Sequence, residues 1–308
     1  MLEALELPHL RSIAIADLER HDPELRATRG TRSATEYCWT CTPAICLYVL
    51  ESEPQLDTLT YLDADLLFGT DPQSLRAELG DGSILLVPHQ LAGPAGDAGR
   101  FNVGWVGFRN DANARAALEW WRERCLEWCF DRVEEDRYGD QKYLDSWPER
   151  FAGVRVSTNP AAGLGTWNEG SRRLEPAREG GVLVDGVPLV FHHHAGFNVH
   201  TANAVTRLLA RWIPNYHATD RPIPLVWTVF GRPSRAAIDL LWRPYMAHLS
   251  DALAELGAAG AQPRLGTSSA RMRGVVAQFA RERAPDRFLG AYRRLPLPLR
   301  HSIGRRLS

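Results

Sequence analysis

The chain has 308 residues, of which 44% are hydrophobic and 24% are charged, and its formal net charge is −1. This composition excludes a disordered or fibrous chain and indicates a globular protein with one large or two medium domains. Residues 1–6 carry no basic region, and no apolar run reaches the length of a spanning helix, so we expect a cytoplasmic protein.

The predicted elements alternate between strands and helices over the first two thirds of the chain. Hydrophobic runs predict strands at residues 11–16, 58–62, 84–87, 101–108 and 154–156. Helical patterns cover residues 34–50, in two pieces divided at Pro43, and residues 112–133 and 141–147. Residues 182–184 and 187–192 are a predicted hairpin around Asp185-Gly186. The alternation predicts an α/β fold with a largely parallel central sheet.

The pattern changes after about residue 200. We expect a boundary between residues 200 and 232, with a first domain over 1–215 and a helical extension over 216–308. A long helix is predicted at residues 234–256. Residues 264–306, the basic tail, hold eleven Arg and two acidic residues, which predicts an anionic partner.

Residues 271–289 of the basic tail have the pattern of an amphipathic helix. The apolar residues Met272, Val275, Val276 and Phe279 recur there at helical spacing, and arginines surround them. This pattern predicts a helix that lies on the anionic inner face of a membrane, and hence a peripheral location. The alternative is a helix that packs on the first domain and keeps its arginines in water.

Two carboxylates, Asp63 and Asp65, follow the predicted strand at residues 58–62. Asp is depleted in strands and costly to bury unpaired, so a pair at a strand end favours a bound cation. An extended chain would place both carboxylates on one side, where their oxygens could hold one hard metal ion. The alternative is an exposed turn after the strand.

Two further motifs follow along the chain. The strand at residues 101–108 contains Gly104 and Gly107, which permit a close approach to its backbone, although a bulge would also explain them. Asp140 and Gln141 then open a short helix, where Asp140 could equally be a plain N-cap.

A run of three histidines, His192, His193 and His194, ends an apolar strand. Their imidazoles could bind a metal ion, and the alternative is an exposed histidine run.

Taken in this order, the four motifs resemble those of the nucleotide-sugar-dependent glycosyltransferases of the GT-A fold, most closely the family 8-like group. In that family Y-L-D-x-D is followed by F-N-x-G-x-x-G-F, G-D-Q and H-x-x-G; here these are residues 61–65, 101–108, 139–141 and 193–196. The resemblance covers about residues 10–200. It implies a GT-A-like catalytic domain that moves a hexose from a nucleotide diphosphate sugar to a glycan, glycolipid or other hydroxyl acceptor.

The resemblance also implies a role for each matching residue. Asp63, Asp65 and His193 would bind Mn²⁺ or Mg²⁺, which would bridge the donor phosphates. Asp140 would hold donor hydroxyls and Gln141 would lie near the reacting face, as the catalytic pair. The donor would also contact Arg32, Asp63, Ala64, Asn102 and Gly104, and the acceptor would contact Trp167 and Asn168. We expect no nucleic-acid partner.

The sequence departs from the family at its start, because residues 1–10 are too short for the βαβ unit that opens these enzymes. The chain would then be short at its N-terminus, bind the nucleotide differently, or have lost turnover. One alternative is therefore a catalytically inactive GT-A-fold subunit that binds sugar or serves assembly. A less favoured alternative is a haloacid-dehalogenase-like phosphatase, which needs a Lys ahead of its second motif, whereas Lys142 lies inside it.

Overall fold

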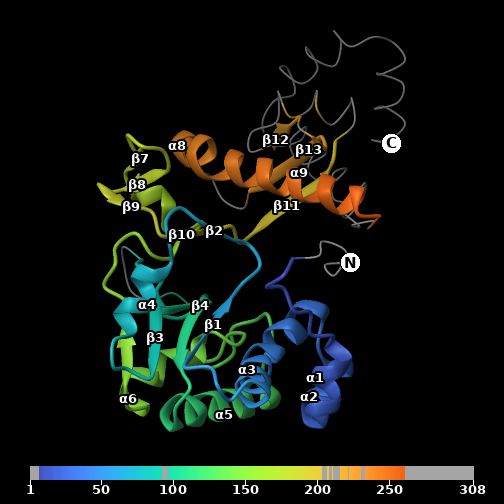
Figure 1. Ribbon diagram of the computed structural model, residues 1–308, viewed down its shortest axis with the longest axis vertical. Coiled ribbons are helices and arrows are strands. Elements are labelled where there is room, and N and C mark those ends of the chain that lie inside the picture. The colour runs from blue at the N-terminus through green and yellow to red at the C-terminus, as the bar shows by residue number, and fades with distance from the viewer. Residues whose placement is uncertain are drawn as a thin grey trace. The chain divides into compact units, whose positions relative to one another are not determined.

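The computed structural model describes residues 7–91, 96, 98–202, 207, 210, 216–220, 222–229 and 233–260 (Figure 1). The chain divides into two compact units. The first unit comprises residues 8–195 and 234–242, and the second contains the described residues between 196 and 233, residues 243–260 and Leu7. The division at residue 196 comes earlier than the expected boundary at 215, and residues 234–242 return to the first unit. The basic tail and its predicted amphipathic helix lie outside the described residues.

A four-stranded sheet in the order β1-β4-β3-β5 forms the centre of the first unit. Its strands are β1 (Thr58–Leu62), β3 (Ile84–Pro88), β4 (Phe101–Arg109) and β5 (Val154–Val156), close to the predicted bounds. β1, β3 and β5 run in one direction, but β4 lies between β1 and β3 and runs against both. Most pairings are therefore antiparallel, and the expectation of a largely parallel sheet is wrong. β3 and β4 are consecutive in the chain and adjacent in the sheet, which favours antiparallel pairing.

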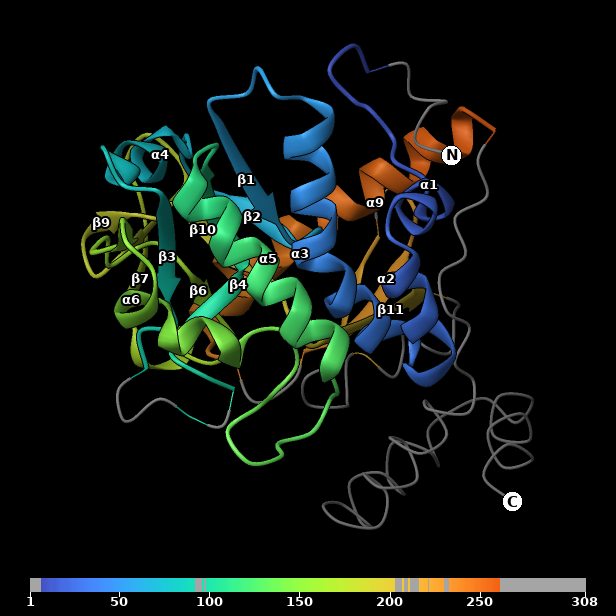
Figure 2. The ribbon, with the colours of Figure 1, turned by 90° about the horizontal axis from the view of Figure 1, so that it is seen from below.

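Helices cover both faces of this sheet. The helices that lie against the sheet or beside it are α3 (Ala34–Ser52), α4 (Gln73–Leu79), α5 (Ala112–Glu127), η3 (Lys142–Ser146) and α6 (Trp147–Arg150). Two further helices pack against α3, namely α1 (Ile15–His21) and α2 (Pro23–Thr28), and η2 (Arg29–Thr31) follows α2. α3 and α5 lie side by side across one face (Figure 2), where Leu50, Phe108 and Trp121 belong to the main core. On the other face Leu75 of α4 packs in a second core with Trp105. Because both faces are covered, β4 is buried along nearly its whole length.

Two predicted helical regions and one predicted strand need correction. Residues 11–16 do not form a strand, because α1 begins at Ile15 and its buried residue Leu18 packs with α2 and α3. α3 is one continuous helix, although Pro43 lacks the N–H that would bond to the preceding turn. α5 ends at Glu127 rather than at residue 133, and Trp128 is already extended.

Two small sheets complete the first unit. One has the order β2-β10-β6 and the other β7-β8-β9. Their strands are β2 (Leu66–Phe68), β6 (Leu164–Gly165), β7 (Leu174–Pro176), β8 (Val182–Val184), β9 (Val187–Pro188) and β10 (Phe191–His193), with η4 (Glu169–Ser171) between β6 and β7. The hairpin turn is confirmed, because Asp185 and Gly186 both have positive φ and join β8 to β9. The single strand predicted at residues 187–192 is two strands, β9 and β10, which belong to different sheets.

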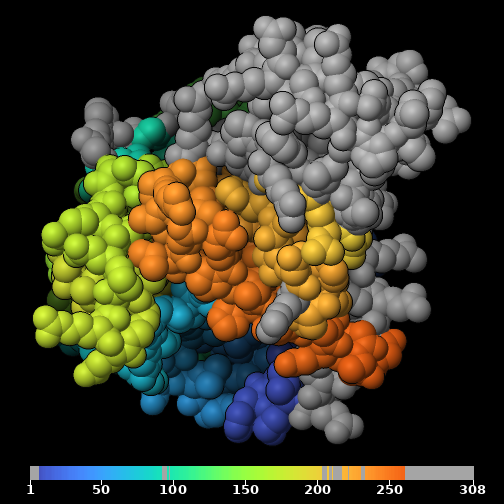
Figure 3. All heavy atoms as spheres, turned by 90° about the horizontal axis from the view of Figure 1, so that it is seen from above, coloured from blue at the N-terminus to red at the C-terminus, as the bar shows by residue number. Residues whose placement is uncertain are grey.

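The second unit contains a sheet in the order β11-β13-β12 and the helix α9 (Arg243–Ala258). Its strands are β11 (Phe197–Thr201), β12 (Tyr216–Thr219) and β13 (Leu225–Val229), so the region expected to be helical also has β structure. α9 packs against β12, as the orange and amber atoms show in Figure 3. It continues α8 (Arg235–Ala237) and the π-helical segment η5 (Ile238–Trp242), so the long helix predicted at residues 234–256 is present. In the part of the chain that the structure describes, no helix is both long and apolar enough to span a bilayer.

Candidate metal centre

The candidate site lies at one edge of the central sheet, where the ends of β1 and β3 meet the start of β4. Leu62 pairs with Trp105, and Val87 pairs with Asn102. In open α/β sheets ligands bind at the carboxyl ends of the strands. The antiparallel direction of β4 brings its first residues to this same edge.

The three predicted metal ligands, Asp63, Asp65 and His193, meet at this edge. One ligand atom from each lies within 4.8 Å of the others. His193 Nε2 lies 3.0 Å from Asp65 Oδ1 and 3.5 Å from Asp63 Oδ2. The carboxylate side chains remain 33% and 32% exposed, which leaves room for further ligands. Two carboxylates and an imidazole are a donor set that fits Mn²⁺ or Mg²⁺.

Asp63 and Asp65 belong to a turn between β1 and β2, and not to an extended strand. Strand alternation is therefore not the reason that their oxygens converge. β10 pairs with β2, which places His193 opposite Leu66, and His194 N donates to the Asp65 carbonyl at 2.8 Å. The sheet β2-β10-β6 therefore holds the turn that contains Asp65 against β10, the strand that carries His193. Metal binding itself stays a prediction.

The three histidines alternate in direction, as residues of a strand do. His193 faces the carboxylates, whereas the rings of His192 and His194 lie 4.1 Å apart in a buried cluster. In this cluster His192 Nε2 lies 2.8 Å from Glu169 Oε2, and Trp242 Nε1 donates to the same oxygen at 3.3 Å. Burial lowers the pKa of His192 to about 3 and raises the pKa of Glu169 to about 7. No motif in the sequence indicated Glu169 or Trp242, which are distant in the chain.

The two carboxylates have opposite pKa shifts. Burial raises the pKa of Asp63, although the charge of His193 and the Tyr61 hydroxyl, which donates to Asp63 Oδ1 at 2.8 Å, act to lower it. Burial also acts to raise the pKa of Asp65, but the hydrogen bond and charge of His193 outweigh it, so this pKa is lowered. A bound cation would favour the ionised form of both groups.

Asp140 is only 4% exposed, and its Oδ2 has no hydrogen-bond partner. Burial raises its pKa to about 7; a hydrogen bond from Thr42 of α3 opposes this shift, and the charge of Asp63 adds to it. A buried carboxylate oxygen without a partner is costly, and a ligand hydroxyl would satisfy it. Asp140 is not an N-cap, because η3 begins after Gln141 and its cap makes no side-chain hydrogen bond.

Asn102 and Gly104 contact His193 directly. Asn102 Oδ1 accepts a hydrogen bond from Gly104 N at 2.7 Å and lies 3.2 Å from His193 Nδ1. A Cβ atom at Gly104 would come within 2.6 Å of both Asn102 Oδ1 and the His193 ring, so the site requires glycine here. The pairing of β3 with β4 is also irregular at this point. Both explanations offered for the glycine therefore apply, namely the close approach of a side chain to the backbone and a bulge in the strand. Donor contacts of Asn102 and Gly104 stay predictions.

His89 is a site residue that the sequence analysis missed. It is 6% exposed, and its Nε2 lies 3.3 Å from Asn102 Nδ2. Trp167 packs edge-on against both His89 and His193, with ring centroids 5.0 and 5.4 Å away. The signal in the sequence was a histidine immediately after a buried strand that ends at Pro88.

The amides of Gln141 and Asn168 are occupied by hydrogen bonds within the protein. Gln141 Oε1 accepts from Val103 N at 3.3 Å, and its Nε2 donates to the Ala98 carbonyl at 2.8 Å. Asn168 is buried, and its Nδ2 donates to the His89 carbonyl at 2.8 Å. Trp167 is partly exposed and remains the better candidate for an acceptor platform.

Arg32 and Ala64 complete the predicted donor contacts. Ala64 lies in the turn between the two carboxylates. Arg32 stacks on Phe130, with its guanidinium carbon 3.9 Å from the ring centroid, and its Nη2 donates to the Leu126 carbonyl at 3.3 Å. These contacts tie Arg32 to the end of α5, and its contact with a donor phosphate stays a prediction.

Comparison with known proteins gives two relatives in Bacillus subtilis strain 168. The chain is 34% identical to the uncharacterized protein YfnF over 218 residues, which cover 68% of this chain and 71% of YfnF. It is 29% identical to the uncharacterized protein YfnD over 265 residues, which cover 84% of this chain and 78% of YfnD. No protein-family model matches the chain, and no solved structure matches it significantly.

Proposed function

The chain belongs to the protein family of Bacillus subtilis YfnF, and we propose that it is a metal-dependent glycosyltransferase of the GT-A type. It would move a hexose from a nucleotide diphosphate sugar to a glycan, glycolipid or other hydroxyl acceptor. The observation that carries this proposal is the meeting of Asp63, Asp65 and His193, which come from two of the four motifs and lie about 130 residues apart in the chain. The other two motifs supply Asn102 and Asp140 nearby.

The donor atoms of the site fit a hard divalent cation. Asp63, Asp65 and His193 would hold Mn²⁺ or Mg²⁺ on one side, and the exposed parts of the carboxylates leave the other side open to phosphate oxygens. Such an ion neutralises the charge that develops on the nucleoside diphosphate when the anomeric C–O bond breaks.

The protein residues around the ligands would bind and orient the sugar. Asp140 has an unpaired oxygen that can accept hydrogen bonds from donor hydroxyls. Trp167 offers a partly exposed apolar ring next to His193, which suits the face of an acceptor sugar. Gln141 fixes the backbone at Val103, at the start of β4.

A second candidate keeps the sugar-nucleotide site but lacks turnover. One observation favours it: within residues 7–57 the structure has helices and no strand, so this segment does not form the βαβ unit that the resemblance implies. Donor hydrolysis by the full chain separates the two candidates. Release of phosphate from a generic phosphomonoester would instead support the phosphatase alternative.

The metal site is tested by thermal unfolding of the full chain. We expect Mn²⁺ together with a nucleoside diphosphate to raise the melting temperature, because a ligand bound only to the folded state stabilises it by about 2.7 kcal/mol at a hundredfold excess over its Kd. Asp65→Ala should lose this shift. Asp57→Ala, an exposed change at the other end of β1, is the matched control and should keep it.

An Asp65→Ala variant with the full metal-dependent shift would contradict the metal assignment. If the shift depends on the metal but no nucleotide sugar in a donor panel is hydrolysed or transferred, the metal site stands and the candidate without turnover is favoured.

A further inference from the structure

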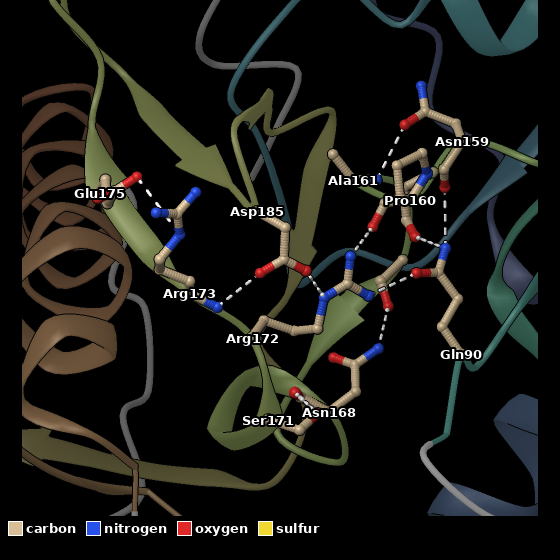
Figure 4. Close-up of polar contacts among 12 residues, drawn as sticks. Gln90, Asn159, Pro160, Ala161, Asn168, Ser171, Arg172, Arg173, Glu175 and Asp185 are labelled. Carbon is tan, nitrogen blue, oxygen red and sulfur yellow. Dashed lines mark hydrogen bonds and ion pairs between the residues drawn. The ribbon is translucent and has the colours of Figure 1, made fainter.

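The segment after β3 is fixed by a dense set of hydrogen bonds around Gln90 (Figure 4). Gln90 has a positive φ of 49°, which is unfavourable for a residue with a side chain. Its Nε2 donates to the carbonyls of Asn159 and Ala162 at 2.8 and 2.9 Å, and its Oε1 accepts from Arg172 Nη1 at 2.8 Å. Both N–H groups of the Gln90 amide and its oxygen are therefore engaged, and these bonds hold the backbone in its strained conformation.

The ring of the preceding residue, His89, is buried in the protein. His89 Nδ1 lies 2.9 Å from the Gly99 carbonyl, and its Nε2 lies 3.3 Å from Asn102 Nδ2. The carbonyl of His89 accepts hydrogen bonds from Trp167 Nε1 and Asn168 Nδ2. Ring and backbone of His89 are thus both held in place.

The hydrogen-bond chemistry allows one placement of protons along this path. A backbone N–H can only donate, so the Asn102 atom that faces Gly104 N must be the oxygen, and the atom that faces His89 must be the NH₂ group. His89 Nε2 must then accept, and its proton lies on Nδ1, which donates to the Gly99 carbonyl. Burial lowers the pKa of His89 to about 4, which agrees with a neutral ring.

Asn102 transmits this arrangement to the metal ligand. Because Asn102 Oδ1 can only accept, His193 Nδ1, 3.2 Å away, must carry a proton. We propose that His89 is a positioning residue for the metal centre: through Asn102 it keeps a proton on His193 Nδ1, so that Nε2, which lies 3.0 Å from Asp65 Oδ1, is the nitrogen that gives up its proton when a cation binds between Asp63 and Asp65. This inference rests on the metal site of the proposed function, but not on the transfer reaction.

The test compares two substitutions that differ in which ring nitrogen they imitate. In His89→Gln, the amide oxygen of the new Gln side chain is as many bonds from Cα as Nε2 is in histidine. This oxygen can therefore still accept the hydrogen bond from Asn102. In His89→Asn the amide reaches only the position of Nδ1, so the bond to Gly99 can remain and the bond to Asn102 is lost. Mn²⁺ affinity of the full chain is measured by electron paramagnetic resonance.

We expect His89→Asn to bind Mn²⁺ at least about tenfold more weakly than the parent, as is usual for loss of an outer-shell partner, and His89→Gln to stay within about threefold. Asn102→Ala should weaken binding, and adding His89→Asn to it should cause no further loss, because both act along one path. His217→Asn, the same change at a partly buried histidine of the second unit, is the control and should bind like the parent.

Equal Mn²⁺ affinity of His89→Asn and His89→Gln, whether strong or weak, would overturn the proposal. So would additive losses for His89→Asn and Asn102→Ala. Ring ¹⁵N NMR of the metal-free parent at neutral pH gives an independent readout, and a His89 proton on Nε2 would also overturn it. If the parent binds no Mn²⁺, the metal-dependent function fails, and this NMR readout alone decides whether the proton arrangement exists.

Discussion

At Asp140 a carboxyl group is buried beside the charge of Asp63, and one of its oxygens has no hydrogen-bond partner. Burial opposes ionisation, so the group is near the middle of its titration at neutral pH, where its pKa is about 7. A residue selected only for stability would be neutral or fully paired at this position. The arrangement suits a group whose hydrogen-bond partners arrive with a ligand.

We expect Asp140→Asn to remove donor turnover while it keeps metal binding, and to make the protein more stable at alkaline pH. The pKa of Asp140 is about 7 in the folded protein, against a usual value of 3.8. The folded state thus binds this proton more tightly, so the associated stability is complete below pH 3.8 and is lost as the pH rises through 7. The loss amounts to about 4 kcal/mol at most, because one pKa unit corresponds to about 1.36 kcal/mol.

Urea unfolding of the parent and of Asp140→Asn at pH 5 and pH 8 measures this difference. From pH 5 to pH 8, the free energy of unfolding of Asp140→Asn should rise relative to that of the parent. The exposed change Asp57→Asn serves as the control. An Asp140→Asn variant with near-parent turnover would show that Asp140 has no catalytic role.

At the scale of the elements, the strands of the central sheet were predictable and their directions were not. A buried strand is recognised by its own residues, as β3 and β4 were, because burial on both faces leaves a largely apolar run. Whether a neighbour runs parallel depends on the connections between strands, which the local pattern does not contain. The reversed β4 is nevertheless what brings Asn102 and Gly104 to the end of β1. The false strand at residues 11–16 arose because tertiary packing of Leu18 outweighs local preference.

We expect Ser33→Ala to destabilise the protein by about 1 kcal/mol, through α3. Ser33 Oγ accepts from Glu36 N at 3.3 Å, and Glu36 Oε2 accepts from Ser33 N at 2.8 Å, so both bonds of a capping box are present. α3 carries Thr42, which forms a hydrogen bond to Asp140. The capping box that fixes the start of α3 therefore also helps to position a residue of the candidate site.

Chemical unfolding checks the Ser33 prediction. Ser33→Asp retains a capping oxygen and should cost much less, and Ser52→Ala at the last residue of α3 is the control. Equal stability of Ser33→Ala and the parent would show that the box contributes nothing to the fold.

At the scale of the whole molecule, the sequence predicted a change of character after about residue 200 but not the path of the chain. The second unit begins at Gly196, and residues 234–242 then return to the first unit. Such a return depends on contacts between distant segments, here Trp242 with Glu169, and no local pattern predicts them. The cluster of Asp63, Asp65 and His193 was predictable because its motifs are short and contiguous, whereas His89 and Glu169, which lie next to this cluster's neighbours, are isolated in the sequence.

The basic tail gives a prediction for the full chain. Each Arg near an anionic lipid surface contributes about 1 kcal/mol, so the chain should sediment with anionic vesicles at low salt and be released at high salt. Changing four arginines of the predicted amphipathic helix to Gln should abolish this binding; they are Arg271, Arg273, Arg281 and Arg283.

A matched control removes the same charge from four exposed arginines of the first unit, Arg20, Arg26, Arg76 and Arg178. This control variant should still sediment. If the two variants lose binding equally, or if the parent does not sediment, the membrane prediction is wrong.

The return of residues 234–242 to the first unit has a consequence for synthesis on the ribosome. Every proposed metal ligand has been translated once residue 193 is made, yet Trp242, which bonds to Glu169 beneath the histidine strand, comes 49 residues later. The nascent first unit must therefore wait for the strands of the second unit to emerge before its buried Glu169 gains this partner. Closure of the cluster that supports His193 therefore follows translation of the three strands of the second unit, whereas α9 comes after Trp242 in the chain.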